Sequence, residues 1–413
     1  MNALTKVVSF DERATSFYRY EIVYTGWIHP DDRGAIMGGD ATQQRFNDDL
    51  LSNEGDLERA RILYPLIVHA LDHAALRDLF AAYNEPANRA KRRSRRAGLL
   101  AVLLGAVSLL IVAASQLEHA YEAHETTSPR LWYALNWIAA VTGIASFVFG
   151  AVGVMYANSK RHWLMQRLMT ERLRQFHFQS LICRIPDLLQ SLGIRSAAKT
   201  YVEARQIWFE QFKARHEGKL AAELDLIVET EEPLDFWLHP PPAKPDLRGL
   251  SGNAAEQLFS AYRELRLTHQ LQYATYKLST ANELLPSLPR GQARLFSNVS
   301  ILAIVALLLL DLGVITGTLM GSWNLVPSPV LHFITLAVAI VALAVRALEE
   351  GLKPEREVER YLHYRSAVRA IRDRYDDAAE PGQKIEIMQE MERLVFDEMC
   401  EFLRTHWRSR FVM

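Results

Sequence analysis

The sequence contains apolar runs that are too long and too poor in charge for an ordinary soluble fold. Ala97 to Leu117 covers 21 residues and Leu131 to Ala157 covers 27 residues, and neither run contains a charged side chain. A helix needs about 20 apolar residues to cross a hydrocarbon layer about 30 Å thick. Each run therefore predicts a transmembrane helix.

Two further apolar runs lie in the second half of the chain. Leu295 to Val326 is interrupted only by Asp311, and Pro327 to Val345 contains no charge. The four runs predict a mainly α fold, a helical membrane protein with four transmembrane helices in two hairpins and helical cytoplasmic regions. Small residues on the second span predict close helix packing in the bilayer: Ala140, Gly143, Ser146, Gly150, Ala151 and Gly153.

Charged residues beside the runs predict their orientation. Arg92, Arg93, Arg95 and Arg96 precede the first run, and we expect them to contact anionic lipid headgroups. The connection between the first two runs is acidic around Glu122. Since basic residues collect on the cytoplasmic side of a span, both termini are expected in the cytoplasm. We predict a multi-pass protein of the cell inner (cytoplasmic) membrane.

The overall charge and the cysteine content speak against several functions. The chain carries 47 Lys and Arg against 48 Asp and Glu, a net charge of −1, whereas nucleic-acid binders usually show a basic excess. Two cysteines, Cys183 and Cys400, are too few for a disulfide framework or a cysteine-based zinc site. The chain has no phosphate-loop, dinucleotide, serine-hydrolase or kinase motif. We expect no enzyme activity, no cofactor, and no catalytic or metal site.

The runs and the stretches between them divide the chain into seven segments. Their order is an N-terminal cytoplasmic domain (1–88), a first transmembrane hairpin (89–157), a cytoplasmic helical region (158–239), a Pro-rich linker (240–248), a cytoplasmic helix (249–294), a second hairpin (295–346) and a C-terminal cytoplasmic helical hairpin (347–413). Consecutive prolines stiffen the linker, so a domain boundary is expected there. The two hairpins have the same orientation and form a parallel architectural repeat. In the first segment, 18–27 fits a short strand and 57–83 a helix.

Two apolar stripes run along the C-terminal segment. Their residues repeat every three or four positions, as in the a and d positions of a coiled coil: Tyr361, Tyr364, Val368, Ile371 and Tyr375, then Met388, Met391, Val395, Met399 and Phe402. A turn is expected at 376–383, which contains Pro381 and Gly382. The stripes can pack within the chain or against another subunit, and the second stripe is a candidate assembly surface for a homo-oligomer.

Asp311 is the one ionisable residue well inside a predicted span. A charge there is costly unless it meets water or a partner, which makes it a functional candidate by default. Asp311 can line a pore or accept protons; alternatively it lies near the outer interface or bonds a neighbouring helix. His332 lies in the opening turns of the fourth span. Because a short loop joins this span to the third, His332 is the candidate pore-lining partner of Asp311.

Two other pairs have spacings that occur in known sites. His69 and His73 are four residues apart, which can present two imidazoles to one metal, although no third ligand is apparent. Arg356 and His363 have the Arg-x6-His spacing of some ribonuclease folds. Packing or surface roles explain both pairs better than chemistry does.

The order of a cytoplasmic helix, a two-span hairpin and a long charged helix resembles the SLATT group, membrane effectors associated with bacterial nucleotide-signalling conflict systems. The residues that carry the likeness precede the third span: Arg263, Arg266, Gln270, Tyr273 and Lys277. The likeness covers about 255–405 and, more weakly, 75–185. Two hairpins and an additional N-terminal region depart from the simplest such unit.

This resemblance implies an oligomeric inner-membrane effector that forms a pore or disrupts the membrane when a cytoplasmic signal triggers it, in a setting such as antiphage defence. The expected partners are the lipid bilayer, other copies of the chain, and a cytoplasmic signalling protein or nucleotide, but no nucleic acid. Two alternatives remain open at this point. One is a regulated ion channel or transporter with a housekeeping role, and the other is a non-conducting membrane scaffold.

Overall fold

The computed structural model describes residues 48–121, 129–155, 157–192, 194–229, 235–240, 252–279, 288–320 and 329–408. These residues form helices and no strand, which confirms the mainly α fold. The expected strand at 18–27 lies outside the described residues. The helices are η3 (Asp48–Leu50), α2 (Glu54–Leu63), α3 (Val68–Leu71), α4 (Ala74–Tyr121), α5 (Pro129–Met155), α6 (Ala157–Cys183), α7 (Ile185–Gln190), α8 (Arg195–His216), α9 (Leu220–Glu229), α10 (Asn253–Tyr262), η6 (Arg263–Thr268), α11 (His269–Lys277), α12 (Pro289–Met320), α13 (Pro329–Leu352), α14 (Pro354–Asp377) and α15 (Pro381–Arg408).

Four of the helices, α4, α5, α12 and α13, are long and apolar enough to cross a membrane, as predicted. In their apolar windows only 6 to 11% of the residues are buried inside the protein. Their large side chains point outward instead, for example Leu103 on α4, Phe147 on α5 and Leu302 on α12. Apolar patches of this size are not left in water, so the chain associates with a membrane. We call α5 and the apolar parts of α4 (from Ala97), α12 (from Leu295) and α13 (to Val345) the membrane layer. The other described helices, together with the beginning of α4, form what we call the polar domain.

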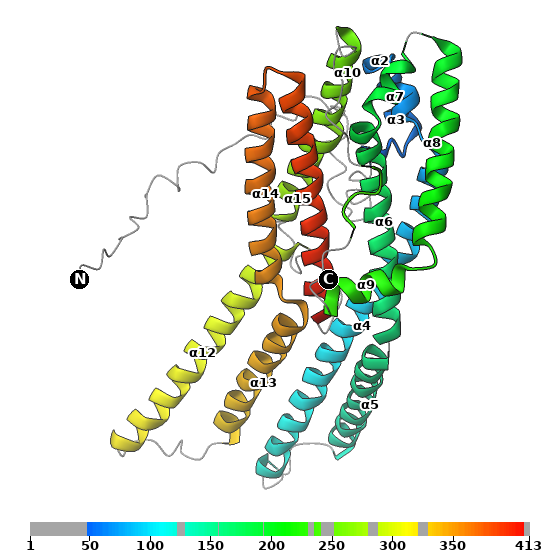
Figure 1. The fold of residues 1–413 in the computed structure, drawn as a ribbon. Helices are drawn as coiled ribbons and strands as arrows, with labels where there is room; N and C mark the ends of the chain where they lie inside the picture. Colours follow the sequence, from blue (N-terminus) through cyan, green and yellow to red (C-terminus); the bar gives the residue numbers. More distant parts are fainter. Residues whose placement is uncertain are drawn as a thin grey trace, which may run out of the picture. The chain divides into compact units, whose positions relative to one another are not determined.

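The membrane layer is a row of helices rather than a closed bundle (Figure 1). α4 packs against α5 on one side and against α13 on the other, and α13 in turn packs against α12. Within the described residues, α5 and α12 make no more than marginal contact with each other. The row therefore has two free edges, formed by α5 and α12.

A hydrophobic core joins several helices of the polar domain. Leu76 and Phe80 of α4 pack with Phe176 of α6, Phe209 of α8 and Leu403 of α15. The core thus contains residues from both sides of the domain boundary expected at the Pro-rich linker. It also contains residues from both sides of the boundary expected at residue 88, and that position lies inside α4. Both boundaries are wrong for the described residues because helices distant in sequence bury their apolar faces against one another. The helix expected at 57–83 is likewise divided into α2, α3 and the beginning of α4.

Each hairpin leads into a long helix of the polar domain. α6 begins two positions after the end of α5, and α14 begins two positions after the end of α13. At the second junction Lys353 has φ 48° and ψ 48°, a left-handed conformation that ends α13, and Pro354 begins α14. Two spans followed by a long helix therefore occur in both halves, while α7, α8 and α9 follow only the first of these long helices.

The C-terminal segment is the expected helical hairpin of α14 and α15, with the turn at 378–380. All five residues of the first stripe are buried within the chain, and so are Met388, Met391 and Met399 of the second. The stripes therefore belong to the core of one copy. The second stripe is not an assembly surface, and that expectation is wrong, because α6 and α10 already cover this side of α15.

Candidate functional site

Asp311 lies on the exposed surface of α12, inside the membrane layer. Its neighbours Leu308, Leu309 and Leu312 are exposed too. Within one copy, the carboxylate therefore occupies a surface that is otherwise apolar. A charge on such a surface is unfavourable against hydrocarbon, which makes Asp311 the part of the membrane layer that most needs water or protein beside it.

His332 is exposed on α13 but lies at a different depth from Asp311. With a rise of about 1.5 Å per residue, Asp311 is about 14 Å from the end of α12, and His332 is about 5 Å from the beginning of the antiparallel α13. The structure thus places both residues on neighbouring helices without aligning them. The two predicted pore-lining candidates do not form a pair at one level.

The predicted lipid-contacting residues lie on α4, next to its apolar part. Arg92, Arg93 and Arg96 are exposed, whereas Arg95 is half-buried. Three of the four guanidinium groups are therefore accessible to a headgroup, which is compatible with the predicted contact.

Two serines join α4 and α5 across the first hairpin. The Ser108 hydroxyl donates to the carbonyl oxygen of Ala139 at 2.8 Å, and the Ser146 hydroxyl donates to that of Ala101 at 2.7 Å. A side-chain carbon added at Gly143 would lie 2.9 Å from the Ser108 Oγ. Of the small residues predicted to pack this hairpin, Gly143 and Ser146 therefore do so. Ala140 is exposed and Gly150 has open space instead, while the side chains at 151 and 153 are not described.

The residues that carry the family resemblance form a polar seam between α10–η6–α11 and the α14–α15 hairpin. Arg263 binds Asp376 through two bonds of 2.6 and 2.7 Å, and the Gln270 side-chain oxygen accepts a bond of 2.9 Å from the Tyr364 hydroxyl. The seam is completed by the Tyr273 hydroxyl 3.4 Å from the Tyr361 hydroxyl, by the Lys277 ammonium 5.4 Å from the centre of the Tyr273 ring, and by Arg266. The seam joins the helix before the third span to the helix after the fourth.

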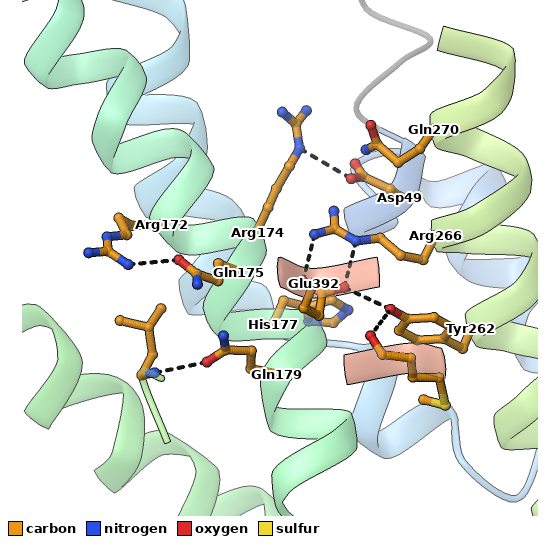
Figure 2. Close-up of polar contacts among 12 residues, drawn as sticks. Asp49, Arg172, Arg174, Gln175, His177, Gln179, Tyr262, Arg266, Gln270 and Glu392 are labelled. Carbon is orange, nitrogen blue, oxygen red and sulfur yellow. Dashed lines mark hydrogen bonds and ion pairs between the residues drawn. The ribbon is translucent and has the colours of Figure 1, made fainter. Parts of the chain in front are cut away.

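Arg266 and Glu392 form the centre of the seam (Figure 2). Both side chains are fully buried, and the guanidinium donates to the two carboxylate oxygens at 2.8 and 2.7 Å. Tyr262 donates a third bond to Glu392 at 2.8 Å, and the ring of Phe178 lies 4.3 Å from the Arg266 guanidinium carbon. Burial alone would lower the pKa of Arg266, but the Glu392 carboxylate beside it raises that pKa above its usual range. The Glu392 carboxylate thus has its ion-pair and hydrogen-bond partners inside one copy.

Arg266 belongs to η6, a six-residue π-helical segment between α10 and α11. π-helical segments are rare and occur often at functional positions. Here the wider turn begins directly after Tyr262, so the two residues that bind Glu392 lie on either side of the change in helix type. The segment sets the rotation of α11, and therefore the register of the seam.

The polar face of α6, which carries Gln175 and Gln179 (Figure 2), binds an irregular segment at 235–238. Gln175 and Gln179 each donate to the carbonyl oxygen of Phe236, at 2.7 and 3.0 Å, and Gln179 accepts from the Leu238 amide at 2.8 Å. Arg172 donates to Gln175 at 2.9 Å. These contacts fix the beginning of the Pro-rich stretch against α6; its residues after 240 lie outside the described part of the chain.

A second charged cluster lies where α14 meets α15. Arg360 binds Glu357 of its own helix at 2.7 Å and also contacts Glu398 of α15. The pKa of Glu398 is raised to about 7, mainly by burial and also by the neighbouring carboxylates Glu357, Glu401 and Glu171, while Arg360 opposes the rise. One guanidinium therefore serves two carboxylates from two helices.

A groove of about 1060 Å³ is lined by residues of α14 and α15 and by Ile227 of α9. Arg356 and His363 both line it, since residues seven apart share one face of α14. The charges of the groove are mixed, because Glu359, Glu398 and Glu401 line it as well. This pattern fits a polar partner surface better than the active site of a ribonuclease.

His69 and His73 do not converge on one site. The His69 ring lies 2.7 Å from the Ser191 hydroxyl, while the His73 ring packs against Phe209 with 4.8 Å between ring centres. α3 ends at Leu71, so the helical spacing that would align them is interrupted. No group of three or more potential metal ligands occurs among the described residues.

Sequence reasoning missed Glu392, Arg360 and Glu398 as members of charged clusters. A signal for Glu392 was present, since it follows Met391 and lies four residues after Met388 on the apolar stripe. A carboxylate on a buried stripe requires a buried partner. Which cation supplies it depends on the tertiary fold.

The comparisons with known proteins are without result. No protein-family model, no curated protein and no solved structure matches this chain.

Proposed function

We propose that this chain is an oligomeric, non-enzymatic effector of the inner membrane that opens a conducting path when a cytoplasmic signal triggers it. The observation that carries the proposal is the exposed carboxylate of Asp311 on the membrane layer. Facing lipid, it would cost several kcal/mol. Facing an aqueous path lined by several copies, it would be solvated and would attract cations.

The polar seam supports a triggered path rather than a permanently open one. It holds α11, which precedes α12, against α14, which follows α13. Both ends of the second hairpin are therefore tied to one another through side chains of the polar domain. A partner that shifts α14 and α15 would act directly on the two spans that carry Asp311 and His332.

The proposal includes the orientation expected from the flanking charges, with the polar domain and both termini in the cytoplasm. A cysteine at Glu122, introduced after Cys183 and Cys400 are replaced by alanine, should react with an impermeant reagent added from outside the cell. Labelling only after the cytoplasmic side is opened would contradict this orientation.

The test is conductance of the purified protein in planar bilayers. Asp311→Asn keeps the size and hydrogen-bonding capacity of the side chain but removes its charge, so single-channel current or cation preference should fall by several-fold. Thr316→Ala is the matched control, because Thr316 is exposed on the same helix and its hydroxyl bonds within α12. Unchanged currents in Asp311→Asn would refute the pore-lining role.

The trigger and the antiphage setting rest on the SLATT resemblance alone. Growth arrest on triggering would separate such an effector from a housekeeping channel or transporter. The groove beside Arg356 and His363 favours a different candidate, a scaffold that binds a cytoplasmic partner without conducting. Absence of current in every condition, with intact protein in the bilayer, would favour that scaffold.

A further inference from the structure

The two edges of the membrane layer differ from its inner helices in having a neighbour on one side only. α4 and α13 each contact two helices of the row, whereas α5 packs mainly against α4 and α12 mainly against α13. Each edge helix therefore leaves one whole face without a partner in the described chain.

The free face of α5 is opposite to its contact with α4. Ala139, Gly143 and Ser146 face α4, as the hydrogen bonds and the buried Ala139 show. The opposite side of the helix, about 180° away, carries four large residues that are between 48 and 65% exposed: Trp137, Val141, Ile144 and Val148.

The free face of α12 has the same character. Phe296 and Ala303 are buried on the side of the neighbouring helices. The opposite side carries four residues that are between 45 and 63% exposed: Ile301, Val305, Leu308 and Leu312. Both free faces thus consist of four large apolar residues with successive spacings of four, three and four along the chain.

The two faces also match in depth. α5 runs from its loop end toward the polar domain, and α12 runs in the opposite direction. Trp137 lies as far from the beginning of α5 as Leu312 lies from the end of α12, about 12 Å at a rise of 1.5 Å per residue. The other three residues then match in order, Val141 with Leu308, Ile144 with Val305 and Val148 with Ile301.

We propose that copies of this chain join edge to edge, with the free face of α5 in one copy packed against the free face of α12 in the next. Contacts between two different surfaces propagate from copy to copy, and they close into a ring where the rotation between neighbouring copies allows it. The inference rests on the proposed function, because Asp311 is what favours a second copy over lipid. Asp311 precedes Leu312 by one residue, so its side chain points about 100° away from the edge that contacts the next copy. In a ring, the carboxylate therefore lies on the face of the helix row between the two edges, and water in the lumen can solvate it there.

Cysteine cross-linking of the full-length protein in membrane vesicles tests this arrangement. Cys183 and Cys400, both buried, are first replaced by alanine. The double variant Val141→Cys with Leu308→Cys should then give, on oxidation, a ladder of dimers, trimers and larger species. Each single variant should stay monomeric. Phe147→Cys with Ile304→Cys is the matched control, since both residues are exposed at similar depth but turn away from the edges.

Dimers from Val141→Cys alone or Leu308→Cys alone would overturn the inference, because they would show like edges meeting. So would a double variant that stays monomeric although its thiols react with a maleimide. Ion release from the same vesicles is recorded separately. A ladder without ion release would support the interface and count against the conducting function. Ion release without a ladder would support the conducting function and count against the interface.

Discussion

Two carboxylates, one in the polar domain and one in the membrane layer, have opposite surroundings within one copy. In the polar domain, the Glu392 carboxylate is fully buried and meets Arg266 at 2.8 and 2.7 Å and Tyr262 at 2.8 Å. In the membrane layer, the Asp311 carboxylate lies on an exposed apolar surface. The first charge is satisfied inside one copy, and the second is not.

This difference separates what one copy can do from what it cannot. The polar domain has a shared core and internally paired charges, so its structure is complete in a single chain. The membrane layer has two unpartnered edges and an exposed carboxylate, so its structure depends on its surroundings.

The largest effect is expected from breaking the buried pair. Glu392→Leu leaves the Arg266 guanidinium buried without its counter-ion, which should cost about 3 to 5 kcal/mol of unfolding free energy. The double variant Arg266→Met with Glu392→Leu should recover most of that loss, because no unpaired charge remains. Chemical unfolding in detergent, followed by tryptophan fluorescence, measures both variants.

The control for that experiment is an ion pair on the surface of the same hairpin. Arg374 binds Glu390 at 2.6 Å, but both side chains are about half-exposed. Arg374→Ala should therefore cost no more than about 1 kcal/mol. A similar loss in both experiments would show that the seam is no more important than the surface.

Acidification should weaken the polar domain next. Burial lowers the pKa of His73 to about 3 and that of His239 to about 4. Between pH 6.5 and these values, the unfolded chain binds protons that the folded chain does not, so stability falls as the pH falls. At pH 5 each histidine should account for up to about 2 kcal/mol.

His73→Leu tests the assignment, because it removes one titrating group and keeps an apolar side chain against Phe209. The variant should lose less stability between pH 7 and pH 5 than the unmodified protein. Surface-exposed His363 offers the comparison through His363→Ala, which removes an imidazole that lies outside the buried core. Identical pH profiles for all three proteins would contradict the role of His73.

The parts of the fold that follow from local pattern were predictable from the sequence. A run of 21 residues without a charge identifies a span wherever it lies, and the Tyr361-to-Tyr375 stripe identifies a buried helix face. The pairing of Arg266 with Glu392 was not predictable, because 126 positions separate them. The same holds for the contact of α4 with α13, and for the shared core that removes the expected boundary at residue 88. These depend on which helices meet.

Within the membrane layer, a smaller effect is expected where the packing is already complete. Gly143→Val places a side chain against the Ser108 hydroxyl, 2.9 Å from the position of its first carbon, and should destabilise the first hairpin by about 1 to 3 kcal/mol. A first side-chain carbon at Gly150 on the same helix meets nothing within 4 Å, so Gly150→Val is the matched control. Thermal unfolding in detergent should separate the two variants, and equal midpoints would mean that α4 and α5 do not pack through Gly143.

The smallest effect concerns the two hydrogen bonds that cross this hairpin. Ser108→Ala and Ser146→Ala each remove one hydroxyl that donates to a carbonyl of the other helix. Such bonds contribute about 0.6 kcal/mol each in a bilayer, because the separated helices find other partners. Ser115→Ala is the control, since its hydroxyl donates to Val112 of its own helix. Unfolding midpoints should fall slightly for the first two variants and stay unchanged for the third. An equal fall in all three would mean that the bonds between the helices contribute no more than a bond within one helix.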